Sequence, residues 1–220
     1  MNSILSNKWL KVPVFLLCLL PAGLLVWGFF HDELTSNPVE YITHTTGDWI
    51  IRFLILTLAI TPARKLFKLP VLIRYRRMLG LFAFFYGCAH FTTYIWLDKS
   101  FDFHEMLVDV AKRKFITVGF TGFLLMVPLA ITSTPGWIRR MGGKNWLLLH
   151  RAIYISAIAG VIHYAWLVKS DERKPIQYGV LVGLLLLWRL GVWLARRKRR
   201  AAGSVAARSE PVTVETAETA

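Results

Sequence analysis

Three histidines lie within or at the end of long apolar runs of the sequence: His90, His150 and His163. An ionisable side chain at bilayer depth is costly, so a membrane protein that has one usually uses it. A neutral imidazole is a common axial ligand of haem iron, and two such ligands leave no position open for oxygen or substrate. The residue types therefore indicate a haem held between helices for electron transfer.

Two of these histidines are predicted to share one depth. His90 follows Arg77 by thirteen residues, and His163 follows His150 by the same number, in two helices predicted to run in the same direction. At 1.5 Å of rise per residue, each separation is ~20 Å. We therefore predict that His90 and His163 are the axial pair, in the outer half of the membrane, and that Arg77 and His150 share a second level near the inner face.

A glycine precedes each member of the predicted pair by three residues, Gly87 before His90 and Gly160 before His163. Positions three apart lie on the same helix face, so these glycines would leave a hollow for the macrocycle. The alternative is close packing of helices, which small residues serve in membranes generally. Both interpretations remain open at this point.

A relay is expected near the inner face, because ~20 Å of helix is a long distance for electron tunnelling from the outer pair. Basic residues there could bind a flavin phosphate or haem propionates: Arg74, Arg76, Arg77 and Arg151. His150 could ligate a second haem, border a different inner cofactor or be an interfacial histidine. Ideal helix geometry turns it ~140° away from the face of His163 unless the helix is kinked.

Arg52 lies near the start of the second apolar run, at its predicted outer end. It could pair with a propionate of the outer haem, or it could extend toward the membrane surface, as long basic side chains often do.

The elements that must position these residues are predicted to be six transmembrane helices. The chain has 220 residues, 55% of them apolar, and a mean hydropathy of +0.47, which is too apolar for an ordinary soluble domain. Its apolar runs approach the ~20 residues that cross a bilayer: 9–30, 49–64, 78–97, 115–132, 149–168 and 176–195. The predicted fold class is an all-α integral membrane protein, a six-helix bundle over 9–195, preceded by a cytoplasmic segment 1–8 and followed by a tail 196–220 that is basic and then disordered.

The net charge of +14 is distributed unevenly along the chain. Most basic residues lie in 1–11, 64–77, 139–151 and 196–208, and most acidic residues lie in the alternate loops. This alternation follows the positive-inside rule and predicts that both termini are cytoplasmic. The same distribution of charge argues against a nucleic-acid partner. The tail is too short for a dinucleotide-binding domain, so we expect reducing equivalents to come from another protein.

Five segments resemble, in their order and spacing, the MsrQ family (also called YedZ), the haem-binding membrane subunits of bacterial methionine sulfoxide reductase systems. They are LAITP at 58–62, LPVLIRYRRMLGL at 69–81, AHFTTY at 89–94, ITSTPGWIRRMGGKNWLLLHRAIY at 131–154 and IHYAWLVKS at 162–170. The resemblance covers roughly residues 9–195 and implies membership of the wider ferric-reductase-like transmembrane superfamily.

This resemblance implies a b-type haem and an FMN in a multi-pass protein of the bacterial inner membrane. Electrons would come from a cytosolic flavin reductase or another donor and would pass to MsrP, a periplasmic molybdopterin subunit. MsrP would then reduce methionine sulfoxide in envelope proteins and so repair them. The chain itself would be a non-catalytic electron-transfer subunit without catalytic residues.

His90, His150 and His163 match the histidines of that family. Familiar two-haem members of the superfamily have two histidines on each of two helices, whereas the third run here has only one. Two other functions remain as alternatives. One is the core of a two-component metalloreductase, and the other is a haem-free transporter or assembly factor whose histidines relay protons or pack.

Overall fold

The computed structural model describes residues 8–168 and 172–209, and every regular element within them is helical. Six segments of this part of the chain are long and apolar enough to cross a membrane. They are α2 (Lys11–Phe30), α3 (Pro38–Leu66), η2 (Pro70–Leu72) with α4 (Ile73–Thr93) and the π-turn η3 (Tyr94–Asp98), α6 (Lys114–Ile131), α8 (Gly143–Leu149) with α9 (Ala152–Leu167), and α10 (Arg173–Ser209). Three short helices complete the described chain: η1 (Lys8–Leu10), α5 (Phe103–Lys112) and α7 (Pro135–Met141).

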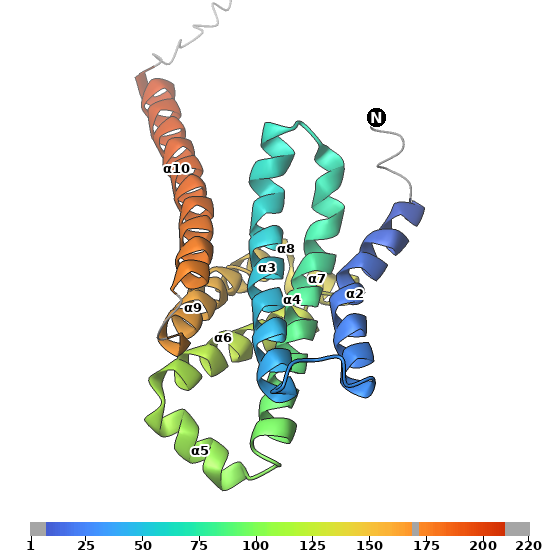
Figure 1. The fold of residues 1–220 in the computed structure, drawn as a ribbon. Coiled ribbons are helices and arrows are strands. Elements are labelled where there is room, and N and C mark those ends of the chain that lie inside the picture. Colours follow the sequence, from blue (N-terminus) through green and yellow to red (C-terminus); the bar gives the residue numbers. More distant parts are fainter. Residues whose placement is uncertain (1–7, 169–171, 210–220) are drawn as a thin grey trace, which may run out of the picture.

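The antiparallel helices α3 and α4 lie side by side at the centre of the bundle (Figure 1). Helix α2 leans against one side of this pair and α10 lies on the other, while α6 and α9 form a second pair. The α3–α4 connection and the end of α10 lie at one end of the bundle, which we call the basic end (residues 64–77 and 196–200). The α2–α3 connection and α5 lie at the opposite, acidic end (residues 31–48 and 98–114).

Two helices are longer than the apolar runs that predicted them. Helix α3 begins at Pro38 rather than at residue 49, because Asn37 caps it by accepting a hydrogen bond from the Glu40 amide at 3.2 Å. The prediction counted apolar residues and so left out the polar first turns. Because the helix includes those turns, Arg52 lies well inside it rather than near its start. Helix α10 continues past residue 195 to Ser209, into part of the segment expected to be disordered. Alanine and arginine, which are strong helix formers, are frequent there, and residues 210–220 lie outside the described chain.

The predicted fifth span is divided in two. Helix α8 ends at Leu149 and α9 begins at Ala152, so His150 and Arg151 lie at the break between them. The angle expected for an unbroken helix between His150 and His163 therefore does not apply. Gly142, with φ +74°, makes the preceding turn from α7 into α8, a conformation that favours glycine.

The core is an aromatic stack that joins α3 and α4. The ring centroid of Phe53 lies 5.6 Å from that of Phe82 and 5.4 Å from that of Tyr86, and Tyr86 is fully buried. Its hydroxyl donates to the Cys18 carbonyl at 2.9 Å and accepts from the Ala22 amide at 3.1 Å. In an unbroken helix the Ala22 amide would donate to the Cys18 carbonyl. Here both groups bond to the Tyr86 hydroxyl instead, which anchors α2 to the core beside Pro21.

Large apolar side chains remain exposed along the outer faces of the long helices. Leu16, Leu20 and Leu24 of α2 and Leu184 and Leu187 of α10 are each more than half exposed. An apolar exterior of this extent is expected where lipid, not water, surrounds the helices.

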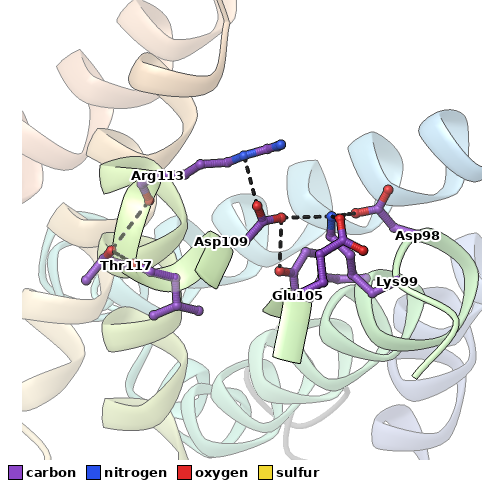
Figure 2. A network of polar contacts seen from close by, with 8 residues as sticks. Asp98, Lys99, Glu105, Asp109, Arg113 and Thr117 are labelled. Carbon is purple, nitrogen blue, oxygen red and sulfur yellow. Dashed lines mark hydrogen bonds and ion pairs between the residues drawn. The ribbon is translucent and has the colours of Figure 1, made fainter. Parts of the chain in front are cut away.

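An ion-pair network holds α5 at the acidic end of the bundle (Figure 2). The Lys99 ammonium lies 2.8 Å from Asp109, 2.6 Å from Glu105 and 4.0 Å from Asp98, and Arg113 contacts Asp109 at 3.2 Å. The hydrogen bond from Lys99 lowers the pKa of Asp109, and the same bond, together with that to Glu105, raises the pKa of Lys99. The network thus ties α5 to the end of η3.

Candidate functional site

His90 and His163 face each other inside the bundle, toward the acidic end. His90 lies in the last turn of α4, and His163 lies near the end of α9. Their ring centroids are 6.2 Å apart and the ring planes are nearly perpendicular, at 88°. The structure therefore brings together the two histidines that the sequence places at one depth.

The separation of the two rings fits ligands on opposite sides of one metal ion. A coordinating imidazole nitrogen lies ~1.2 Å from its ring centre and ~2.0 Å from the metal, so two opposed imidazoles have centroids ~6.4 Å apart. Among the described residues, no group of three or more His, Cys, Asp or Glu side chains could hold a metal ion. Two protein ligands are too few for a bare ion, which takes about four or more, but they suffice for an iron held in a macrocycle.

A backbone carbonyl of a neighbouring helix fixes each ring. The Nδ1 of His90 donates to the carbonyl of Thr43 at 3.0 Å, and the Nδ1 of His163 donates to the carbonyl of Phe115 at 2.7 Å. The Thr46 hydroxyl oxygen lies 3.3 Å from the same nitrogen of His90. Metal-binding histidines usually donate their second ring nitrogen in this way, which fixes the tautomer and the orientation of the ring. In the neutral ring, Nε2 is thereby left as the unprotonated nitrogen, the one able to coordinate a metal.

The glycines predicted to open a hollow for the macrocycle lie against side chains of other helices. A Cβ at Gly87 would lie 3.1 Å from Phe123 and 3.2 Å from Met126 of α6. A Cβ at Gly160 would lie 3.6 Å from Ile51 of α3. These contacts favour the alternative interpretation, close helix packing, for both glycines.

Arg52 belongs to a polar cluster between α3 and α10. Its Nε donates to the Tyr178 hydroxyl at 3.0 Å, and its guanidinium lies 3.4 Å from the Asp48 carboxylate. Lys174 contacts the same carboxylate oxygen at 3.4 Å. The other Asp48 oxygen is buried and has no hydrogen-bond partner within the described chain. Arg52 is thus engaged by protein groups at mid-helix rather than extended toward the end of α3.

A second candidate site is a cavity of about 320 Å³ toward the basic end. Arg76, Arg77 and His150 all line it. The His150 ring stacks on Trp146 with centroids 3.8 Å apart, and its Nδ1 donates to the Trp146 carbonyl at 3.0 Å. Its Nε2 is buried and lacks a hydrogen-bond partner among the residues that the structure describes. A cavity with two guanidinium groups and an available imidazole nitrogen suits an anionic cofactor.

The other two predicted basic residues do not line this cavity. Arg74 is half-buried and Arg151 is exposed, at the break between α8 and α9.

The sequence analysis missed a basic residue inside the sixth span. Arg189 of α10 donates to the Tyr154 hydroxyl at 2.9 Å and to the Leu58 carbonyl at 2.8 Å. Its Nε is buried without a partner in the described residues. A charged residue in the middle of an apolar run was the available signal. Thr43 and Phe115 carry no such signal, because they act through backbone carbonyls that every residue has.

One known protein family matches the central part of the chain. Residues 46–161 match the family described as ferric reductase like transmembrane component, a match that includes His90 and His150 and ends just before His163. No solved structure matches the chain.

Three bacterial relatives bear the name protein-methionine-sulfoxide reductase heme-binding subunit MsrQ. The Herminiimonas arsenicoxydans protein is 52% identical over 87% of this chain and 89% of its own length. The Xanthomonas campestris pv. campestris (strain 8004) protein is 48% identical over 87% and 90%, and the Caulobacter vibrioides protein is 46% identical over 84% and 87%. With six spans and relatives of this kind, the chain is a multi-pass protein of the inner membrane. It belongs to the MsrQ family, within the ferric-reductase-like transmembrane proteins.

Proposed function

We propose that this chain carries electrons across the inner membrane through a b-type haem held by His90 and His163. The main support for this proposal is the geometry of His90 and His163, whose ring centroids lie 6.2 Å apart and whose Nδ1 atoms are both hydrogen-bonded to carbonyls. The names of the relatives, which are haem-binding subunits, support the same cofactor. A haem with two imidazole ligands accepts and releases one electron without an open coordination position.

The chain's own residues supply ligands, orientation and charge. Thr43 and Phe115 hold the two imidazoles in one tautomer, so that Nε2 of each would be available to hold the iron of a bound haem. The surrounding apolar helices exclude water and keep the site at low dielectric, which strengthens the influence of nearby charges on the cofactor. Arg52 and Lys174 place two positive charges around Asp48, and an anionic propionate could replace the carboxylate as their partner.

We further propose that the cavity at the basic end holds an inner cofactor, FMN or a second haem. Arg76 and Arg77 would bind its phosphate or propionates, and Nε2 of His150 would contact it. This site lies on the side from which a cytosolic flavin reductase or another donor would deliver electrons, given the positive-inside prediction. The outer haem would then supply MsrP on the periplasmic side, where methionine sulfoxide is reduced.

Cofactor analysis of the purified protein tests the ligand assignment. We expect a Soret band, and we expect His90→Ala and His163→Ala each to lose most of the haem. His104→Ala is the matched control, because His104 is an exposed histidine of α5. Normal haem content in both ligand variants would refute the assigned pair, and absence of a Soret band after expression with ample haem would refute haem binding.

A reoxidation experiment tests the electron acceptor. Purified MsrP should reoxidise the reduced protein faster than a ferric chelate does. The opposite order would favour the metalloreductase alternative.

A further variant tests the inner site. His150→Ala should slow reduction by the cytosolic donor more than it lowers outer haem content. Loss of all haem with flavin unchanged would contradict the inner-site assignment.

A further inference from the structure

Gly119 of α6 lies directly against the ring of His163. A Cβ at position 119 would lie 2.5 Å from Nδ1 of that ring and 2.9 Å from both Cε1 and Cγ. Real Cβ atoms do not come so close to other heavy atoms, and the ring is held in place by its hydrogen bond to Phe115. Any other residue at 119 therefore requires the imidazole to move.

Gly47 of α3 has the same relation to His90, at a longer distance. A Cβ at position 47 would lie 3.4 Å from Cε1 and 3.5 Å from Nδ1 of the His90 ring. This is ordinary van der Waals contact, so a methyl group at position 47 would touch the ring without displacing it, and only a larger side chain would press on it.

The two arrangements share one spacing. In each, the carbonyl that accepts from Nδ1 belongs to the residue four before the glycine: Thr43 before Gly47, and Phe115 before Gly119. Residues four apart lie above one another on a helix, and each carbonyl points toward the residue four ahead. A glycine at that position leaves the carbonyl uncovered on one side, so a ring from the neighbouring helix can reach it.

We propose that Gly47 and Gly119 are positioning residues. Each leaves a bare stretch of helix backbone, here called a seat, against which one histidine ring lies. The seat sets the position and rotation of that ring. This proposal rests on the proposed function, in which His90 and His163 are the ligands. Because each seat fixes one ring, the two seats together set the 88° angle between the ring planes. They also maintain the Nδ1 hydrogen bonds, which make an imidazole a stronger electron donor to the metal.

Gly122, one turn further along α6, offers a matched control. A Cβ there would lie 3.1 Å from the Ala159 side chain and 3.6 Å from the Ser156 carbonyl, both on α9, and no contact with His163 is among its nearest. Gly122→Ala therefore perturbs packing of the same two helices without entering the seat. Gly183→Ala, where nothing lies within 4 Å, is the control for the substitution itself.

The test compares these variants in purified, folded protein by haem content, by the midpoint potential and by the electron paramagnetic resonance spectrum of the ferric haem. That spectrum depends on the angle between the axial ligand planes. Gly119→Ala should weaken haem binding about 10- to 100-fold, the usual effect of losing a partner of a metal ligand. In the haem that remains, the potential should rise and the spectrum should change. Gly47→Ala should match the unmodified protein, because its methyl group meets the His90 ring at ordinary contact distance, whereas Gly47→Val, whose γ-methyl groups extend beyond that contact, should keep its haem and show a smaller change of the same sign. Gly183→Ala should match the unmodified protein, and Gly122→Ala should show only the smaller effect of altered packing between α6 and α9.

Two results would refute the proposed role of Gly47 and Gly119. One is a Gly119→Ala spectrum and potential equal to those of Gly122→Ala. The other, which decides if Gly119→Ala does not fold, is a Gly47→Val protein with an unchanged spectrum and potential. If His163→Ala itself retains haem, the ligand assignment fails instead, so the two failures are distinguishable.

Discussion

Replacement of Lys99 by methionine removes the only cation of the ion-pair network that is itself buried. The Lys99 side chain is 7% exposed and that of Asp109 is 10% exposed, whereas those of Glu105 and Asp98 are each 54% exposed. Water can therefore solvate Glu105 and Asp98 once the ammonium is gone. Asp109 cannot be solvated as well and would keep only Arg113 and the more distant Tyr94 hydroxyl, at 3.5 Å.

The size of the effect follows from this difference in exposure. Removing one partner of a buried ion pair destabilises a protein by about 3–5 kcal/mol, because the other charge is left uncompensated. Since Arg113 still contacts Asp109, we expect Lys99→Met to lower the free energy of unfolding by an amount at the low end, ~3 kcal/mol. Glu105→Gln, on an exposed partner, should change it by less than ~1 kcal/mol.

The pH dependence has a definite sign. The lowered pKa of Asp109 means that its contribution to stability is present above the unfolded aspartate value of ~3.9 and is lost as pH falls through the folded pKa. The raised pKa of Lys99 means that its contribution is present below the unfolded lysine value of ~10.4 and is lost as pH rises through the folded pKa. Stability from this network should therefore be level between about pH 5 and pH 9.

Reversible unfolding in mixed detergent micelles, followed by circular dichroism, measures these changes, and limited proteolysis between α5 and α6 reports local opening. The double variant Lys99→Met/Asp109→Leu should recover part of the loss, because no buried charge remains. A Lys99→Met protein as stable as Glu105→Gln, or one whose stability still falls at acid pH like that of the unmodified protein, would refute the reasoning.

Three further substitutions test other parts of the fold, each by the same unfolding measurement. Tyr86→Phe should cost about 1–3 kcal/mol, because the paired groups of α2 lose their hydroxyl partner; no loss would mean that they simply pair with each other. Arg189→Lys should cost about 1.5–3 kcal/mol, since an ammonium lacks the planar fork by which the guanidinium makes both hydrogen bonds; equal stability would show that α10 is held by packing alone. Gly142→Ala should cost about 1–3 kcal/mol because of the backbone at φ +74°, and a neutral result would mean that the α7–α8 turn can be rebuilt.

The sequence predicted those features that depend on hydropathy and on depth along a helix. His90 and His163 were paired because equal numbers of residues separate them from the inner ends of two parallel spans, and the rings do meet. The start of α3 was placed too late, because Asn37 and Pro38 begin a helix whose first turns are polar.

What the sequence could not predict are contacts made across helices by the backbone. The carbonyls of Thr43 and Phe115 are chemically like any others, and only the packing of helices shows that they receive the histidines. The glycines three residues before the histidines drew attention because they are near in sequence. Gly47 and Gly119 are more than forty residues from the rings they contact, so no local pattern connects them.

The distribution of the two half-sites among the helices has a consequence for how the protein is made. His90 and its carbonyl partner belong to the α3–α4 pair, and His163 and its partner belong to the α6–α9 pair. The α3–α4 half can therefore be complete as soon as its own hairpin has entered the bilayer, before α6 and α9 have left the ribosome. The opposed arrangement of ligands exists only after the two hairpins dock, so cofactor capture reports the last stage of assembly rather than insertion, and a variant that inserts normally but docks poorly would accumulate without its cofactor.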